Sequence, residues 1–93
     1  MAIRLLISSK VKPGQAAAYA KAFAPIERET NTEPGCEQYE LFQSVTNPDK
    51  LVLMERWTDQ ASLDAHLKVM AARDMSVHGG FRAEPPARER YEV

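Results

Sequence analysis

Four stretches of the chain have the hydrophobic and polar pattern of β-strands. Residues 3–11, 36–45 and 51–57 are rich in apolar side chains, largely at every second position. Residues 46–50 separate the last two with the composition of a tight hairpin connection, which predicts an antiparallel pair. Residues 88–93 are polar and follow two prolines, so we expect them to form a strand at the edge of the sheet.

The spacing of apolar residues changes to that of a helix over residues 15–30. We expect this helix to end by Asn31. Pro25 lies inside the pattern, where it removes one backbone donor and crowds the preceding turn. A kink near Ala22, rather than a break, is therefore expected.

A second helix is predicted to begin after Thr58 or Asp59, because either side chain can cap its first turn. Residues 71–80 are expected to hold a further short helical piece that ends at Gly79-Gly80. The second helix should turn one apolar stripe toward the sheet. The stripe consists of Leu63, His66, Leu67 and Met70.

The predicted order, βαββαβ, is that of a ferredoxin-like α+β fold with a four-stranded antiparallel sheet and both helices on one face. Leu5 and Leu6 are adjacent, and residues 51–54 are apolar without interruption. A sheet with one face in water should alternate instead. We therefore expect a second copy of the chain to cover the open face, giving a homodimer.

Composition narrows the possible partners. The 93 residues suit a single domain, residues 1–93, and carry a net charge of −1, which argues against nucleic acid as a partner. No apolar run approaches the ~20 residues of a membrane span, and the first residues do not resemble a secretion signal, so we expect a cytoplasmic protein. The single cysteine, Cys36, follows a turn without basic neighbours and is expected to be inert.

Cofactor sites have no signal in the sequence. The two histidines, His66 and His78, have no carboxylate motif at metal-ligand spacing. Gly79-Gly80 lacks the lysine and the helix start of a phosphate-binding loop. We therefore expect no metal, nucleotide or flavin.

Five short motifs stand out along the chain: Lys12-Pro13-Gly14, Glu33-Pro34-Gly35-Cys36, Tyr39-Glu40-Leu41, Glu55-Arg56-Trp57 and Ala65-His66-Leu67. In their order and spacing, they resemble the antibiotic biosynthesis monooxygenase family over residues 3 to about 70. The resemblance implies a dimeric ferredoxin-like α+β barrel with an apolar cleft between each sheet and its own helices. Two departures are Ser8 and Ser9, where some members have an asparagine on the first strand, and residues 77–81 in place of a His-Phe pair.

Within this family, members include cofactor-independent oxygenases of phenols and quinols, haem-degrading enzymes and an isomerase of a small phosphorylated molecule. The resemblance favours a cofactor-independent monooxygenase that oxidises a small phenol or quinol to a quinone with O₂. Alternatives are a haem-binding enzyme with His66 as iron ligand, and a stress-response dimer that binds a small molecule without turnover. Isomerisation would need a basic cluster, and Arg56, Lys68 and Arg73 are scattered.

Five residues are candidates for the site. His66 is a candidate general base, because the unperturbed pKa of histidine is about 6.5. The alternative is a buried histidine that is hydrogen-bonded to a backbone carbonyl. Trp57 is expected to wall the mouth of the cleft and offer its indole N–H to a substrate oxygen. Glu55 shares its strand face and orients His66 or forms a salt bridge. Tyr39 faces either the cleft or the dimer interface. His78 lies in a loop that closes over the cleft or is simply exposed.

Overall fold

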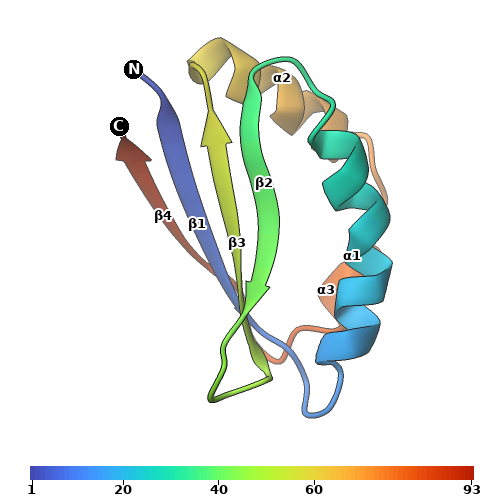
Figure 1. The fold of residues 1–93 in the computed structure, drawn as a ribbon. Helices are drawn as coiled ribbons and strands as arrows, with labels where there is room; N and C mark the ends of the chain where they lie inside the picture. Colours follow the sequence, from blue (N-terminus) through green and yellow to red (C-terminus); the bar gives the residue numbers. More distant parts are fainter.

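The computed structural model describes residues 1–93 and has the predicted element order (Figure 1). The four strands pair antiparallel in the order β2-β3-β1-β4, which places β4 at an edge as expected. All three helices lie on one face of the sheet, so the ferredoxin-like α+β prediction is confirmed. The elements are β1 (Ile3–Lys10), α1 (Ala16–Thr30), β2 (Cys36–Gln43), β3 (Lys50–Trp57), α2 (Gln60–Ala71), α3 (Ser76–Gly80) and β4 (Ala87–Glu92).

Most predicted boundaries hold within two residues. The helix α1 runs through Pro25 without a break and ends before Asn31. Asp59 caps α2 by accepting a hydrogen bond from the Ser62 N–H at 2.8 Å. The prediction that Val45 belongs to the second strand is wrong, because the Ser44 N–H already bonds the Lys50 carbonyl at 2.9 Å to close the hairpin. No helix of the chain has the length and apolar character needed to cross a membrane.

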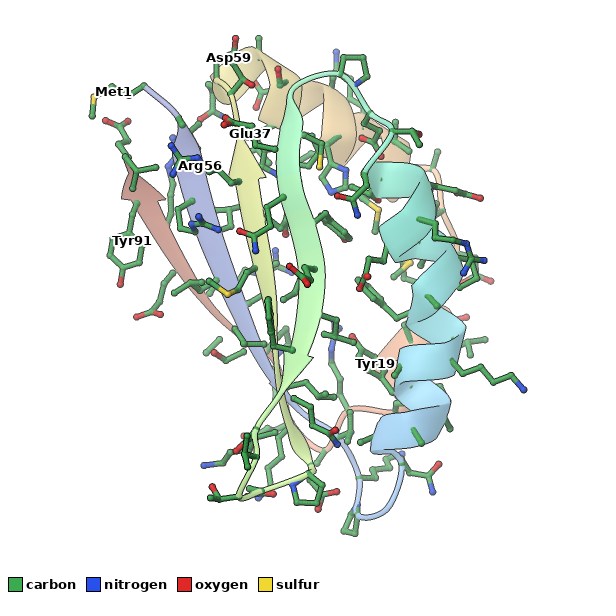
Figure 2. All side chains as sticks on the ribbon, viewed as in Figure 1. Met1, Tyr19, Glu37, Arg56, Asp59 and Tyr91 are labelled. Atoms are coloured by element: carbon green, nitrogen blue, oxygen red, sulfur yellow. The ribbon has the colours of Figure 1, made fainter.

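The core lies between the sheet and the helices. Because side chains alternate along a strand, every second side chain of β1 and β3 points toward α1. Three aromatic rings form the centre of the core. Tyr19 stacks on Phe23, which stacks on Tyr39, with 5.9 Å between ring centroids in each pair. Figure 2 shows Tyr19 on the helix side of the sheet. The buried apolar residues are Ile3, Val11, Ala16, Tyr19, Phe23, Ile26, Tyr39, Leu51, Leu53, Trp57 and Leu63.

One member of the predicted α2 stripe does not face the core. Leu63 and His66 are buried and Met70 is half-buried, but Leu67 is 49% exposed. Successive residues turn by about 100° around an α-helix. Leu63, His66 and Met70 therefore lie close to one line along the helix surface. Leu67 lies to one side of this line, at the edge of the space beneath the helix.

The opposite face of the sheet is covered by no helix (Figure 1). Apolar side chains meet across the strands on this face, with Leu6 opposite Met54 and Phe42 opposite Val52. Tyr91, at the edge strand, is 48% exposed on the same side (Figure 2). The expected apolar character of both faces is therefore present, mixed on the open face with Arg4, Gln38, Glu40, Arg56 and Glu89.

The turn between α1 and β2 depends on a glycine that no other residue can replace without strain. Gly35 has φ +80°, and a Cβ added there would lie 2.1 Å from the Oγ of Ser62 on α2. Its carbonyl accepts a hydrogen bond from the Thr58 N–H at 2.9 Å. The absence of a side chain thus lets the turn pack directly on the first turns of α2.

We predict that Gly35→Ala lowers the free energy of unfolding by about 2–5 kcal/mol, because left-handed backbone strain adds to overpacking. Gly14→Ala is the matched control: Gly14 has a similar φ of +76° but open space at its Cβ position. It should lose only about 1–2 kcal/mol. Urea denaturation monitored by circular dichroism measures both. Equal losses in the two variants would show that the contact with Ser62 is unimportant.

Candidate active site

A cavity of about 350 Å³ lies between the sheet and the three helices. Its lining is mainly apolar and aromatic, with Phe23, Leu41, Leu53 and Met70 among the residues that form it. Eight polar or titratable side chains interrupt this lining. They are Ser9, Tyr19, Tyr39, Glu55, His66, His78, Arg82 and Arg88.

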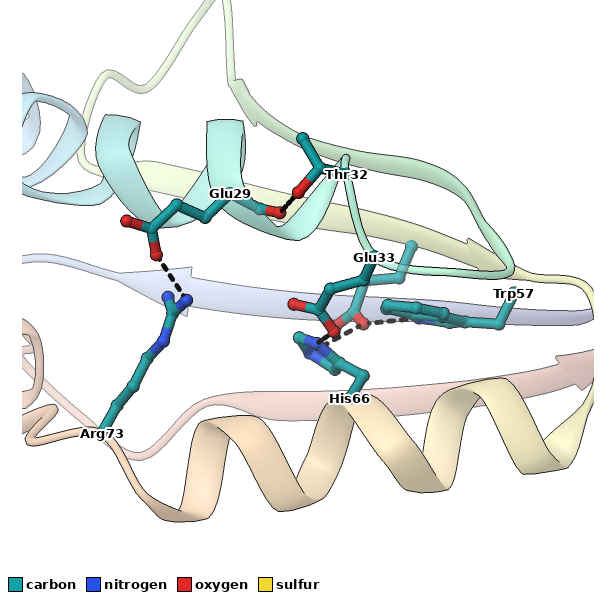
Figure 3. Close-up of polar contacts among 7 residues, drawn as sticks. Glu29, Thr32, Glu33, Trp57, His66 and Arg73 are labelled. Carbon is teal, nitrogen blue, oxygen red and sulfur yellow. Dashed lines mark hydrogen bonds and ion pairs between the residues drawn. The ribbon is translucent and has the colours of Figure 1, made fainter.

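His66 is held between two glutamates (Figure 3). Its Nδ1 lies 3.0 Å from the Oε1 of Glu33, and its Nε2 lies 3.9 Å from the Oε1 of Glu55. A carboxylate only accepts hydrogen bonds, so Nδ1 carries a hydrogen and donates it to Glu33. The second distance exceeds a hydrogen bond. Nε2 therefore has no hydrogen-bond partner, and His66 is 97% buried (3% exposed).

Three different parts of the chain build this arrangement. Glu33 lies in the turn that Gly35 allows to pack against Ser62, one helical turn before His66 on α2. Glu55 projects from β3 toward α2 because side chains alternate along a strand. The cap at Asp59 fixes where α2 begins, and so which face of it carries His66.

Trp57 supports the site from behind. Its side chain is fully buried, its Nε1–H donates to the Oε1 of Glu55 at 2.9 Å, and its ring stacks on His66 with 4.6 Å between centroids. The expectation that Trp57 walls the mouth of the cleft is wrong. The end of β3 lies beneath the first turns of α2, so the indole does not reach the cavity, and its N–H is already bonded to a carboxylate.

Burial changes the acid–base properties of the surrounding groups. It raises the pKa of Glu55 above the ordinary 4.5, against the opposing effects of the Trp57 hydrogen bond, His66 and Arg88. It likewise raises the pKa of Tyr39, with a further contribution from the Glu55 charge, so the Tyr39 hydroxyl remains protonated. Burial raises the pKa of the Cys36 thiol to about 11, which agrees with the expectation of an inert cysteine.

Tyr39 and His78 both line the cavity. Of the two orientations predicted for Tyr39, the structure has the one toward the cleft, with the ring 5.4 Å from that of His66. His78 is not in a loop but on the short helix α3, which makes the loop expectation wrong. Its Nε2 bonds the Ala22 carbonyl of α1 at 3.0 Å, in the turn before Pro25, and its ring meets the edge of Phe23 at 6.3 Å. The predicted site residues thus form one group around His66, with His78 on the far side of the aromatic core.

Sequence reasoning missed Glu33, Arg82 and Arg88. Glu33 was visible only as part of a turn motif, and nothing local indicates that this turn reaches α2. Arg82 follows α3 and forms an isolated bridge with Val11, while Arg88 shares the inner face of β4, opposite Ile7. An arginine at every second position of a sheet-edge strand is the only signal that could have placed Arg88 beside the cavity.

Comparison with known proteins agrees with this fold and shows the family. Residues 2–77 match the family model described as antibiotic biosynthesis monooxygenase. YcnE of Bacillus subtilis (strain 168), a protein named provisionally as a monooxygenase, is 30% identical over 57 residues, which are 61% of this chain and 60% of YcnE. The alignment therefore spans less than two thirds of that relative.

Solved structures resemble the whole chain. A conserved protein from Methanosarcina mazei Go1 superposes with a TM-score of 0.86 at 26% identity, covering 98% of this chain and 91% of that one. A protein from Nitrosomonas europaea, provisionally named an antibiotic biosynthesis monooxygenase, gives a TM-score of 0.88 at 20% identity, covering 99% and 89%. The fold defines a ferredoxin-like α+β protein with a cavity between the sheet and its helices. The chain belongs to the antibiotic biosynthesis monooxygenase family, as the family match over residues 2–77 shows.

We predict that Glu55→Gln makes the protein more stable than the wild type as the pH rises. Burial favours the protonated form of Glu55, so its carboxyl contributes to stability when the pH is below the ordinary pKa of 4.5. This contribution is lost as the pH rises through the higher pKa of the folded state. Each unit of the increase corresponds to about 1.4 kcal/mol. Glutamine keeps an oxygen that can accept from Trp57.

Thermal unfolding of both proteins between pH 4 and pH 8 measures the effect. The difference in Tm should be smallest at pH 4 and widen above it. Glu84→Gln, in the exposed segment between α3 and β4, serves as the control and should show no widening difference from the wild type. A constant difference for Glu55→Gln would contradict the raised pKa.

Proposed function

We propose that this protein is a cofactor-independent monooxygenase that oxidises a small phenol or quinol to a quinone with O₂. The observation that carries the proposal is the buried His66 imidazole, whose Nδ1–H is bound to Glu33 while Nε2 has no hydrogen-bond partner at a mainly apolar cavity. Such a nitrogen is suited to accept a proton, and the apolar walls exclude water from the products. Membership of the family supports the same reaction class.

In the proposed reaction, the phenolic hydroxyl gives its proton to Nε2 of His66. The negative charge of Glu33 stabilises the imidazolium, in the manner of a carboxylate that orients a catalytic histidine. The electron-rich ring carbon of the phenolate then adds O₂, and the imidazolium protonates the resulting peroxide. Loss of the proton on that carbon breaks the O–O bond, so one oxygen atom remains as the new carbonyl and the other leaves as water. The substrate supplies all the electrons.

The neighbouring groups have supporting roles in this proposal. The protonated Tyr39 hydroxyl lines the cavity and can donate a hydrogen bond to a substrate oxygen. Glu55 lies beside Nε2 and, with a pKa raised by burial, can exchange a proton with it. Trp57 acts only through these two residues, by bonding Glu55 and stacking on His66.

We also propose that two copies associate through their open sheet faces. The paired apolar side chains Leu6, Met54, Val52 and Phe42 lie on the face that no helix covers. A contiguous apolar patch of this kind is typical of a protein interface. Its mixture with arginine and glutamate side chains supplies polar partners for the rim.

Oxygen uptake with a panel of substituted phenols and hydroquinones tests the reaction. We predict that His66→Ala lowers kcat at least about 100-fold, the usual contribution of a general base. Lys68→Ala, on the exposed side of the same helix, should leave uptake unchanged. Wild-type uptake equal to buffer, or undiminished uptake by His66→Ala, would refute the proposed reaction. A ligand that raises the Tm and is recovered unchanged would instead favour binding without turnover.

Light scattering after gel filtration tests the association. The wild type should elute with twice the chain mass of 10.4 kDa. Met54→Glu places a charge in the middle of the proposed interface and should shift the protein to the monomer mass. Val45→Glu is the control, because Val45 is fully exposed in the hairpin connection. A monomeric wild type would refute the dimer without affecting the reaction.

A further inference from the structure

Two arginines line the cavity without a carboxylate partner. Neither Arg82 nor Arg88 has a carboxylate oxygen within 4.0 Å, whereas Arg56, Arg73 and Arg90 each pair with a glutamate. The chain has more acidic than basic residues, so acceptors are not scarce. The two unpaired guanidinium groups therefore give the cavity a positive character that the chain as a whole does not have.

Arg82 is held in place by its backbone. Hydrogen bonds of 2.8 Å from the Lys12 N–H to the Phe81 carbonyl and from the Ala83 N–H to the Lys10 carbonyl tie this segment to the end of β1. Its side-chain Nε is buried and has no hydrogen-bond partner. A buried donor without an acceptor is costly, and an anion bound at the guanidinium would offset part of this cost through its charge.

His78 adds a second unpartnered polar atom nearby. Its Nε2 bonds the Ala22 carbonyl, so Nε2 carries the hydrogen, while its Nδ1 is buried without a partner. His78 and Arg82 are four residues apart around the end of α3, where the Arg82 N–H bonds the Gly79 carbonyl at 3.2 Å. Both side chains line the cavity.

Arg88 lies between this basic end and the imidazole of His66. It projects from the inner face of β4, opposite Ile7, and its charge is close enough to Glu55 to lower the pKa of that carboxyl. The aromatic rings of Phe23 and Tyr39 line the space between the two ends. The cavity thus has guanidinium groups from its Arg82 end to its middle, His66 at the other end, and aromatic rings alongside.

We propose that the substrate is an aromatic acid, whose carboxylate binds the guanidinium groups of Arg82 and Arg88 while its phenolic hydroxyl faces His66. This inference rests on the proposed function and names the substrate class for the same site. Guanidinium and carboxylate groups match in geometry and form charge-assisted hydrogen bonds. Because the buried Arg82 Nε has no acceptor within the protein, an analogue without a carboxylate should bind more weakly, so the carboxylate would contribute to specificity.

Calorimetric titration with two matched pairs of probes tests the proposal. The pairs are 2,5-dihydroxybenzoate and 6-hydroxy-2-naphthoate, whose 5- and 6-hydroxyl groups lie away from the carboxylate, each compared with its methyl ester, which has nearly the same shape but no charge. Each acid that binds should do so about tenfold to a hundredfold more tightly than its ester, the range expected for charged hydrogen bonds. The titration is performed without measuring turnover, so it is independent of the oxygen-uptake assay.

The preference for the acid should fall to about the level of the ester in Arg82→Gln and in Arg88→Gln. Arg88 is exposed enough for its variant to fold even if Arg82→Gln does not. Arg90→Gln is the matched control, since Arg90 is on the same strand but bonds Gln60 outside the cavity. Equal affinity for acid and ester, no binding of any probe, or a preference that survives in Arg88→Gln would overturn the proposal. Preference for the acid without O₂ uptake would support it while refuting the oxygenase reaction.

Discussion

The structure of the site depends on one hydrogen bond, from the Nδ1–H of His66 to the carboxylate of Glu33. It joins the turn after α1 to the middle of α2, two segments that are otherwise connected only by packing. Because the His66 ring is 97% buried (3% exposed), its orientation cannot change without leaving a polar atom unpaired. The direction of Nε2, and therefore the chemistry available to the cavity, follows from this single contact.

Aromatic packing restricts the same ring from two other sides. Trp57 stacks on His66 and Tyr39 meets its edge, so the imidazole has little freedom to rotate. Rigid support of this kind is what a preorganised base requires, because no energy is then spent on reorientation during the reaction. Trp57 also bonds Glu55, which couples the second carboxylate to the same aromatic group. The side chains around His66 thus behave as one unit rather than as independent residues.

Much of the fold was predictable from local pattern. The alternation of apolar residues placed the strands, helical spacing directed His66 inward, and Asp59 provided a recognisable cap. Val45 and Leu67 were misplaced because an apolar side chain at the end of a strand or the edge of a helical stripe can be exposed. Local pattern does not say where strand pairing stops or how a helix is rotated on its sheet.

The candidate site was predictable only in part. His66, Glu55 and Tyr39 lie on regular elements, whose periodicity indicates the face they share. Glu33 reaches His66 because Gly35 lets a turn approach α2, and this is a tertiary contact with no local signal. Arg82 lies in the irregular segment after α3, where periodicity carries no information. The burial of Trp57 behind the cavity likewise depends on how α2 covers the end of β3.

The hydrogen on the His66 ring provides the most direct test of this account. Two-bond ¹H–¹⁵N correlation spectra of the ¹⁵N-histidine-labelled protein distinguish the two ring nitrogens, and comparison with His66→Gln assigns the signals. The account predicts that Nδ1 of His66 is protonated across the neutral pH range, and that Glu33→Gln alters its resonance. A neutral ring with hydrogen on Nε2 and a bare Nδ1 would contradict the account, because the nitrogen at the cavity would then have no lone pair to accept a proton.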